Sequence, residues 1–460
     1  MLDSSKRCCN ISRKAGSIMR NALTLTGFGK NIQLTRRTRF LLYCHDTFGL
    51  GHIRRTLSLA ASFTSLLPNA EVLIVTGSPL AHAFTLPSHV DYIKLPTVIK
   101  MGNGTYRALH LDMDFATIRD VRATMLRDIA AAYMPDVFLV DHAPQGLKGE
   151  VLPTLALLRD SNPTCLRVLG LRDIVDERAI IRQTWIREGI YNTLEQNYDL
   201  ILVYGSRHLY DIGQEYALPP TVEQRIRYCG YLDRVTDAHP GNTSDSFPQR
   251  VASVRSSLTL GTEPLIVLTV GGGGDGFPLM HTYLSGLQQL PSNPFTSVLV
   301  TGPLMDEQEQ RDLHAFAEVF PQGKVRVERF LPDPLPLLGA ADLVVTMAGY
   351  NTVCELLALQ QRMLLVPRTV PRQEQLVRAS LLAQHGLAHM LHPDQLTPQR
   401  LLDSVTYALT QPHPQAWQLG GMDITFQGQR IATEAILDRL TTLHHRQRMM
   451  ENNRVIAQIS

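Results

Sequence analysis

The run RFLLYC (39–44) and the segment DTFGLGHIRRTLSLA (46–60) decide the fold of this 460-residue chain. The first has the pattern of a buried strand, and the second passes through two glycines and a histidine into a helical pattern. Glycine allows the sharp backbone turn that joins a strand directly to a helix. A strand followed at once by a helix begins a βαβ unit, so this stretch predicts a parallel sheet covered by helices.

The same alternation extends along the chain in two series. Candidate strands of the first series are 40–44, 71–75, 90–95, 136–141, 165–170 and 200–205, with amphipathic segments such as 113–133 and 178–197 between them. Those of the second series are 264–270, 297–302, 324–330, 342–347 and 362–367, and RIATEAILDRLTTLHHRQRMM (430–450) predicts a final helix. The stretch between the two series is rich in Pro, Gly, Ser, Thr and Asp, which is typical of a linker.

We therefore predict an α/β protein with two doubly wound Rossmann-like domains that face a central cleft. The predicted parts are a basic tail (1–38), a first Rossmann-like domain (39–233), a linker (234–263), a second Rossmann-like domain (264–420) and a C-terminal helix (421–460). Such sheets bind ligands outside the carboxyl ends of their strands, so functional residues are expected directly after the apolar runs.

Composition narrows the class of protein. Residues 1–39 contain nine Lys or Arg and one acid, so this segment carries +8 and the remainder −6. The mildly acidic body argues against a nucleic-acid binder. The tail is expected to be disordered, and an upstream extension, a membrane-surface arm and a transit-like segment stay open as interpretations. The six cysteines lack CxxC spacing, so we expect reduced thiols in the cytoplasm, with peripheral membrane contact left open.

The stretch LTVGGGGDGFP (268–278) places four consecutive glycines between a strand and a helix. A glycine backbone lets a ligand approach closely, and a helix N-terminus offers N–H donors, so the combination suits a pyrophosphate. The stretch has neither the GKS or GKT of a Walker A loop nor a GxGxxG pattern. A tight turn that binds nothing is the alternative interpretation.

Two further stretches place polar residues after strands. In VVTMAGYNTVCELLALQQRMLLVP (344–367), Thr352 and Glu355 lie three residues apart and share a helix face. Thr352 could meet a phosphate and Glu355 could hold ribose hydroxyls, although an acid near a helix N-terminus is also simply stabilising. In VPRTVPRQEQLVRA (366–379), Glu374 and Gln375 open the next helix, either as caps or as ligands.

Together, the glycine loop, AGYNTVCE (348–355) and RQEQLVRA (372–379) resemble the nucleotide-sugar half of GT-B glycosyltransferases. They are similar to the GxxTxxE … QxxNA run of the peptidoglycan N-acetylglucosaminyltransferase family. The segment FGLGHIRRTLSLA (48–60) resembles that family's GGxGGHxxPxxxLA loop. The resemblance covers roughly residues 39–440, is strongest over 264–380, and is greatest to the bacterial "predicted glycosyltransferase" subfamily.

The resemblance implies donor-binding roles for matching residues of the second domain. By position, the residues that would line the diphosphate are Gly271, Gly272, Gly273, Gly274, Gly349 and Thr352. Glu355 would hold the ribose, and Leu331, which follows Phe330, would contact the nucleobase. Glu374 and Gln375 would contact the sugar. The family commonly has Gln where Glu374 stands and Asn where Arg378 stands, so the identity of the sugar stays open.

The first domain supplies the candidates for catalysis and acceptor binding. Gly49 and Gly51 place His52 at a helix start, which keeps an imidazole neutral and suited to act as a general base. By resemblance, His52 either is the base or binds acceptor phosphate. The remaining candidates, which follow other strands, are Asp141, His142, Arg172 and Asp173. Asp141 and His142 either act together as a second catalytic base or form a polar turn at the end of a strand. Arg172 and Asp173 either bind the acceptor or are structural.

The resemblance, together with these residues, implies a hexosyltransferase that moves a sugar from a nucleotide-diphosphate donor, UDP-linked, to an unidentified acceptor hydroxyl with inversion. Main-chain amides and helix dipoles would stabilise the leaving diphosphate, so no metal and no cofactor are expected. The DMD triplet (112–114) precedes a helix, so N-capping explains it better than a metal site. A nucleotide-sugar 2-epimerase or hydrolase and a non-catalytic nucleotide-sugar-binding protein are the alternatives, and the oligomeric state stays open.

Overall fold

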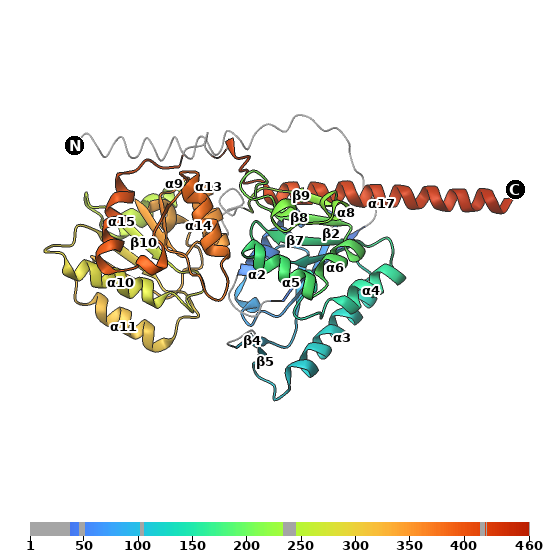
Figure 1. The fold of residues 1–460 in the computed structure, drawn as a ribbon, viewed down its shortest axis with the longest axis horizontal. Helices are drawn as coiled ribbons and strands as arrows, with labels where there is room; N and C mark the ends of the chain where they lie inside the picture. Colours follow the sequence, from blue (N-terminus) through green and yellow to red (C-terminus); the bar gives the residue numbers. More distant parts are fainter. Residues whose placement is uncertain are drawn as a thin grey trace. The chain divides into compact units, whose positions relative to one another are not determined.

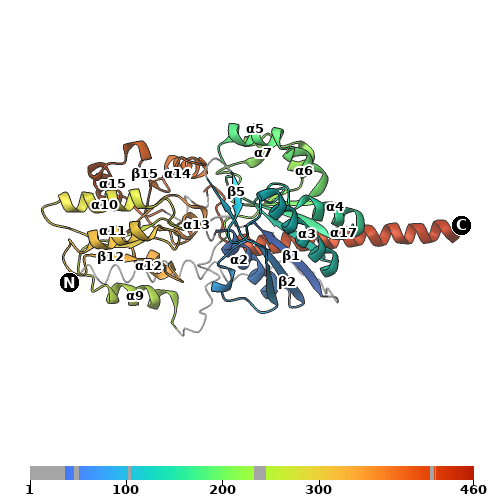
Figure 2. The same cartoon turned by 90° about the horizontal axis from the view of Figure 1, so that it is seen from below.

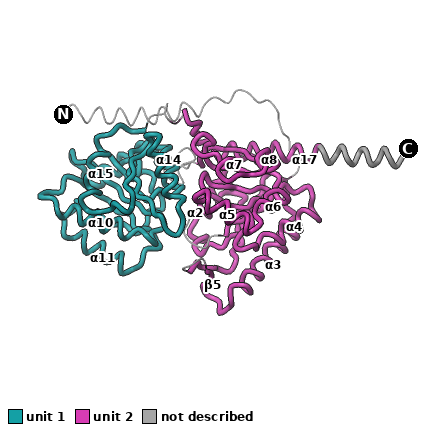
Figure 3. Tube along the Cα trace, in the orientation of Figure 1, with its two compact units in different colours: residues 1–33, 233–418 teal, residues 34–232, 419–460 magenta. Residues whose placement is uncertain are grey.

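The computed structural model describes residues 37–45, 51–101, 105–232, 245–414, 419 and 421–459, except for the side chains of 444 and 446–459. The chain divides into two compact units (Figure 3). Unit 1 takes its described residues from 233–418, and unit 2 takes them from 34–232 and 419–460. The basic tail lies outside the described residues as far as residue 36, and so do Cys8 and Cys9.

Unit 2 is built on a seven-stranded sheet in the order β3-β2-β1-β6-β7-β8-β9, with every neighbouring pair parallel. Its strands are β1 (Thr38–Cys44), β2 (Ala70–Thr76), β3 (Val90–Lys94), β6 (Val137–Asp141), β7 (Leu166–Arg172), β8 (Leu200–Tyr204) and β9 (Ile226–Tyr228). The chain fills one side of β1 and then crosses to the other side at β6. In doubly wound sheets this switch point is where ligands bind.

Helices cover the sheet of unit 2 (Figures 1 and 2). They are α2 (Gly51–Leu66), α3 (Phe115–Tyr133), α4 (Leu152–Ser161), α5 (Arg178–Arg187), α6 (Ile190–Asn197), α7 (Ile212–Glu215) and α8 (Pro220–Glu223), with a short antiparallel pair, β4 (Val98–Lys100) and β5 (Tyr106–Ala108). The C-terminal helix α17 (Gly428–Ile459) returns to this unit and packs on α2, β7 and β8. Ile436 and Leu440 of α17 are buried, so this helix completes the first Rossmann-like domain instead of standing apart from it.

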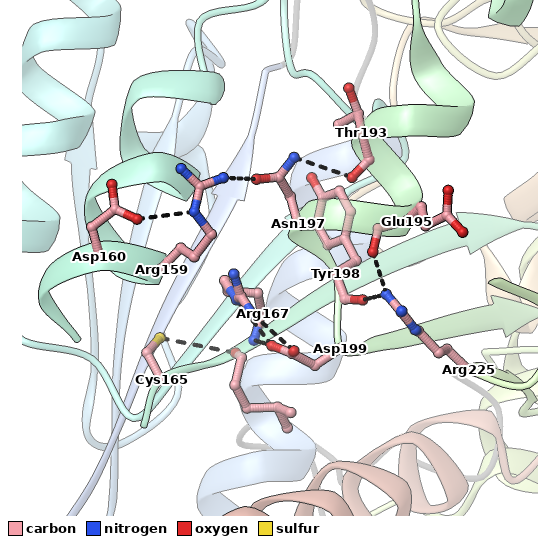
Figure 4. Close-up of polar contacts among 11 residues, drawn as sticks. Arg159, Asp160, Cys165, Arg167, Thr193, Glu195, Asn197, Tyr198, Asp199 and Arg225 are labelled. Carbon is pink, nitrogen blue, oxygen red and sulfur yellow. Dashed lines mark hydrogen bonds and ion pairs between the residues drawn. The ribbon is translucent and has the colours of Figure 1, made fainter. Parts of the chain in front are cut away.

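Polar groups at the amino ends of β7 and β8 pair with one another (Figure 4). The guanidinium and the backbone N–H of Arg167 donate to the Asp199 carboxylate over 2.8–3.0 Å. Arg225 donates to the carbonyl oxygens of Glu195 and Tyr198, each at 2.7 Å, and so caps the C-terminal end of α6. The charged side chains at this edge of the sheet therefore pair with one another or cap a helix, and so stabilise the fold.

Unit 1 repeats the doubly wound arrangement with a six-stranded sheet in the order β12-β11-β10-β13-β14-β15, again parallel throughout. The strands are β10 (Leu265–Thr269), β11 (Thr296–Val300), β12 (Val325–Glu328), β13 (Leu343–Thr346), β14 (Met363–Leu365) and β15 (His389–Met390). The helices are α9 (Phe247–Ser257), α10 (Phe277–Gln289), α11 (Glu307–Ala317), α12 (Leu335–Ala340), α13 (Tyr350–Ala358), α14 (Glu374–Gln384) and α15 (Pro398–Thr410). Helices α10 and α15 pack together over the central strands, where Ile266, Leu268 and Met280 are buried. Here the switch point lies between β10 and β13.

The structure confirms each strand predicted from an apolar run and adds elements that the sequence pattern did not predict. Helix α9 lies inside the predicted linker and packs on α12. Its sequence is mostly polar because only Val251 on it is buried, so it shows no apolar pattern from which a helix could be predicted. The amphipathic segment 178–197 forms two helices, which are separated at Gly189, whose backbone is left-handed (φ 67°). The short strands β4, β5, β9 and β15 were not predicted.

Two expectations from composition can also be compared with the structure. Cys44, Cys165, Cys229 and Cys354 are buried free thiols, as predicted. Among the residues that the structure describes, no helix combines the length and the apolar content needed to cross a bilayer.

Candidate active site

The loop after β10 carries the four glycines, and two of them adopt conformations that favour glycine. Gly271 has φ 67° and Gly273 has φ 98°. A β-carbon on Gly273 would lie 2.1 Å from the carbonyl oxygen of Thr301, so this position requires glycine for packing. A β-carbon on Gly271 would meet no atom within 4 Å, so the backbone there is open to a ligand. The carbonyl oxygen of Gly272 accepts a hydrogen bond from Leu304 N at 2.8 Å, which fixes the loop.

The start of α13, after β13, is also open. Gly349 is the N-cap residue, and a β-carbon there would meet no atom within 4 Å. Thr352 is the third residue of the helix and is partly exposed, whereas Glu355, one turn in, is 6% exposed. The first N–H groups of a helix point out of its end and favour anions. The strands before this helix and before the glycine loop are neighbours and parallel, so both features lie at the same edge of the sheet.

An arginine that was not predicted joins the glycine loop to the start of α14. Arg368 Nη1 donates to Asp275 at 2.7 Å, Nη2 donates to Glu374 at 3.3 Å, and its backbone N–H donates to Gln375 Oε1 at 3.2 Å. Burial alone would lower the pKa of Arg368, but the carboxylates of Asp275 and Glu374 raise it above its ordinary value. Arg368 therefore bridges two acids across this edge and keeps its own charge.

A second arginine of unit 1 replaces the asparagine that the family commonly has. Arg378 is 1% exposed, and its Nη1 donates to the carbonyl oxygen of Ala348 at 2.9 Å. Its guanidinium also lies over the Tyr350 ring, 5.7 Å from the centroid. Ala348 has a left-handed backbone (φ 61°) directly before α13, and this hydrogen bond holds it there. The departure at 378 thus supports the turn into α13.

The residues assigned to the nucleobase lie after β12, two strands away from β10 in the sheet. Phe330 is 42% exposed and Leu331 is partly exposed. The structure therefore places every predicted donor residue of unit 1 at the carboxyl edge of one parallel sheet. The four elements that supply them follow β10, β12, β13 and β14.

At the switch point of unit 2, His52 and Asp141 form a close pair. His52 is the second residue of α2, and its Nδ1 lies 2.5 Å from Oδ2 of Asp141 at the end of β6. Arg55, one turn further along α2, donates from Nε to Oδ1 at 2.8 Å and from Nη2 to Oδ2 at 2.7 Å. The Asp141 and Arg55 side chains are 1% and 2% exposed, and that of His52 is 14% exposed.

The charge on Asp141 fixes the tautomer of His52. Burial would raise the pKa of Asp141, but the positive charge of Arg55 and hydrogen bonds from His52 and Arg55 outweigh burial and hold this pKa below its ordinary value. An ionised carboxylate can only accept hydrogen bonds, so Nδ1 of His52 carries the proton. The basic atom of neutral His52 is therefore Nε2.

His142 does not pair with its neighbour Asp141, which corrects one of the two interpretations of that dipeptide. The backbone of His142 is left-handed (φ 66°), and its Nε2 accepts a hydrogen bond from Arg172 Nη2 at 2.9 Å. Arginine has no acceptor atom, so His142 is neutral and protonated on Nδ1. Its ring lies 5.6 Å from that of His52, and the ring of His45, directly after β1, lies 4.6 Å from His52 on centroid distances.

The remaining candidates of this domain are placed as follows. Asp173 is 2% exposed; it accepts a hydrogen bond from Ile174 N at 2.8 Å and lies 3.5 Å from the Tyr231 hydroxyl. Gly51 begins α2, and Gly49 lies outside the described residues. Asp114 caps α3 by accepting from Thr117 N at 3.0 Å, which confirms the N-capping prediction. No group of three His, Cys, Asp or Glu side chains in the described part of the chain is arranged to hold a metal ion.

Sequence reasoning missed Arg55, His45 and Arg368. A signal for Arg55 existed, because residues three apart on a helix share a face and Arg55 stands three after His52. His45 follows a predicted strand directly, which is where ligands of such sheets were expected. Nothing in the local pattern around Arg368 indicates that its side chain reaches Asp275.

Residues 267–418, within unit 1, match the model of the glycosyltransferase family 28 C-terminal domain. The chain is 29% identical, over 157 residues, to a Halalkalibacterium halodurans protein named UDP-N-acetylglucosamine–N-acetylmuramyl-(pentapeptide) pyrophosphoryl-undecaprenol N-acetylglucosamine transferase. The match spans 34% of this chain and 42% of that relative, which is less than half its length.

Two solved structures share the fold across most of the chain. The kitacinnamycin glycotransferase superposes with a TM-score of 0.58 at 20% identity, covering 88% of this chain and 100% of that one. MurG of Acinetobacter baumannii gives a TM-score of 0.52 at 15% identity and covers 88% and 99%. These matches confirm the resemblance inferred from the sequence motifs. Residues 267–418 are therefore similar to the glycosyltransferase family 28 C-terminal domain, and the chain has the GT-B fold.

Proposed function

We propose that this chain is a glycosyltransferase that moves a sugar from a UDP-linked donor to an acceptor hydroxyl, with inversion and without a metal. The observation that carries the proposal is the open glycine backbone at Gly271 and Gly349, at the switch-point edge of a family 28 domain. Two such openings, one of them at a helix start, offer main-chain N–H donors to a diphosphate.

The donor end of the reaction needs a stabilised leaving group. In the proposal, the anomeric carbon–oxygen bond breaks and the nucleoside diphosphate leaves with the bonding electron pair. The backbone N–H groups of Gly271–Gly274 and of the N-terminus of α13 stabilise that negative charge. They do so effectively because fixed dipoles need no reorganisation during the reaction. Glu355 would hold the ribose, and Glu374 and Gln375, both of which Arg368 contacts, would hold the sugar.

The acceptor end needs a base. Nε2 of His52 takes the proton of the acceptor hydroxyl as its oxygen attacks the anomeric carbon, and the resulting imidazolium is stabilised by ionised Asp141 at 2.5 Å. Attack on the face opposite the leaving diphosphate inverts the anomeric configuration. In the proposal, Arg172, which donates to His142 Nε2 at 2.9 Å, contacts the acceptor.

A ligand panel tests the donor class. Thermal melts with UDP, GDP, CDP, ADP and TDP, each with EDTA, should show stabilisation by UDP, because a ligand that binds the native state raises the melting temperature. A chain that responds to none of these nucleotides, or only after a divalent metal is added, contradicts the proposal. His52→Ala should abolish transfer and keep the UDP shift, whereas Glu355→Ala should weaken the shift itself.

The two alternatives make different predictions in the same assay. An epimerase or hydrolase would consume UDP-sugar at an undiminished rate with no acceptor present, and a binding protein would show the UDP shift without any turnover. The relative from Halalkalibacterium halodurans is named for UDP-N-acetylglucosamine, so this sugar is the first donor to try. We further propose a cytoplasmic location with peripheral membrane contact, which sedimentation with lipid vesicles would test.

A further inference from the structure

Arg55 shares the carboxylate that serves the proposed base. Its guanidinium binds both oxygens of Asp141, at 2.8 and 2.7 Å, and the second of these oxygens also accepts from His52. Arg55 Nη2 also lies 3.1 Å from Nδ1 of His52, and both atoms are within hydrogen-bonding distance of the same oxygen, Oδ2 of Asp141. A His–Asp pair would need only the carboxylate, so the third, buried and charged member requires its own explanation.

Two further histidine rings lie close to His52. His45 after β1 and His142 after β6 place their rings 4.6 and 5.6 Å from that of His52, and Arg172 of β7 engages His142. Burial raises the pKa of Tyr204 of β8 well above its ordinary value; the charge of Asp141 raises it further and the charge of Arg55 lowers it. Among the described residues packed here, Asp141 is therefore the acid and Arg55 the cation nearest to His52.

We propose that Arg55 is a positioning residue that clamps the Asp141 carboxylate and keeps His52 in its neutral, Nδ1-protonated form, ready to accept a proton at Nε2. The clamp works in two ways. The fork of the guanidinium fixes the plane of the carboxylate, and so the direction in which His52 points. Its positive charge, together with the N-terminal end of α2, opposes a second positive charge on the imidazole before substrate arrives.

The effect of Arg55 on catalysis rests on the proposed function, in which His52 is the base. The effect of Arg55 on the protonation of His52 can be measured in the free protein. A positive charge close to an imidazole disfavours a second positive charge on the ring, so removing the charge of Arg55 should make His52 easier to protonate. In the variant Arg55→Gln, the midpoint of the His52 titration should therefore lie above that of the wild type. Arg55→Lys keeps the charge and loses the fork, so its midpoint should stay close to that of the wild type.

The experiment is an NMR titration of the histidine side chains in the full chain, without substrate. The His52 signal is assigned by its loss in His52→Gln, and circular dichroism and thermal melts establish that each variant is folded. The charge control is Arg127→Gln, which removes an exposed arginine of α3 whose partner is Asp128. An unchanged His52 midpoint in folded Arg55→Gln, or an equal rise in Arg127→Gln, overturns the proposal.

A second measurement separates this proposal from the proposed function. The acidic limb of the pH profile of UDP-sugar turnover should move upward in Arg55→Gln by the same amount as the NMR midpoint. If the NMR midpoint rises while the wild type turns over no nucleotide sugar, Arg55 controls His52 and the proposed function fails. If turnover is observed and its acidic limb does not follow the midpoint, His52 is not the base that Arg55 controls, and the catalytic part of the inference fails.

Discussion

Replacing Gly271 by alanine tests whether the open backbone after β10 receives the donor diphosphate. Gly271 has φ 67°, and a β-carbon there meets no atom within 4 Å, so the variant should fold. An alanine in the left-handed region costs about 1–2 kcal/mol of folding free energy. The methyl group would occupy the space next to the amides, and losing one hydrogen bond to a charged group costs about 1.5–3 kcal/mol. The Kd for UDP should therefore rise about ten- to hundredfold.

Gly323 provides the matched control. Its φ is 82°, and a β-carbon there also meets no atom within 4 Å, so Gly323→Ala should carry the same backbone strain. It precedes β12 and thus lies at the amino edge of the same sheet, away from the proposed site. Isothermal titration calorimetry with UDP, alongside thermal melts, should show similar losses of stability and a weaker Kd only for Gly271→Ala. Wild-type affinity in Gly271→Ala, or equal weakening in both variants, would refute the assignment.

Three further predictions follow from the same geometry. Gly273→Ala should lose at least about 2 kcal/mol and melt several degrees below Gly271→Ala, because its β-carbon would lie 2.1 Å from the Thr301 carbonyl oxygen at φ 98°; equal melting temperatures would show that the loop repacks. Arg368→Ala should release Asp275 and Glu374 and weaken UDP-sugar binding by about tenfold, more than it weakens UDP binding. Calorimetry with UDP and with UDP-sugar measures both affinities, and Arg311→Ala, which removes an exposed arginine, is the control. An equal loss of affinity for both ligands would count against a role of Arg368 at the sugar. Asp141→Asn should cost about 3–5 kcal/mol by leaving the Arg55 charge buried. Because the folded-state pKa of Asp141 lies below its ordinary 3.8, its stabilisation is present above that pH and is lost as the pH falls further, so the difference in melting temperature between wild type and variant should shrink between pH 5 and pH 3. A difference that grows toward acid would contradict this.

The fold could be predicted because the central strands of parallel sheets are buried on both faces. Strands such as β6 and β8 have every residue buried, so they stand out as continuous apolar runs. The edge strand β9 has three residues, none of them buried, and β15 has two partly buried residues. Such strands carry too little apolar pattern to be recognised, and their pairing is decided by the strands beside them.

The candidate site could be predicted only in part, for a related reason. Residues that follow central strands, such as His52, Asp141 and Gly271, are placed by the backbone, and the backbone follows from the apolar pattern. Their partners are placed by long side chains that reach between elements. Arg55 and Arg368 each contact a carboxylate 86 or 93 residues away in the sequence, and no local spacing specifies such a target. The pairing of His52 with Asp141, rather than Asp141 with His142, depends on the same tertiary reach.

In the proposed function, the two units use one topology for two opposite electrostatic tasks. A leaving diphosphate needs N–H donors and no uncompensated acid, and in unit 1 the switch point offers open glycine backbone while Arg368 bridges Asp275 and Glu374. A base needs a nearby anion to stabilise its protonated form, and in unit 2 the corresponding position after the central strand holds His52 against Asp141. An unbridged carboxylate would repel the diphosphate, and a second unopposed cation at His52 would suppress its basicity. Arg55 and Arg368 each contact the acids at their own switch point, and in the proposed function both arginines limit the negative charge there.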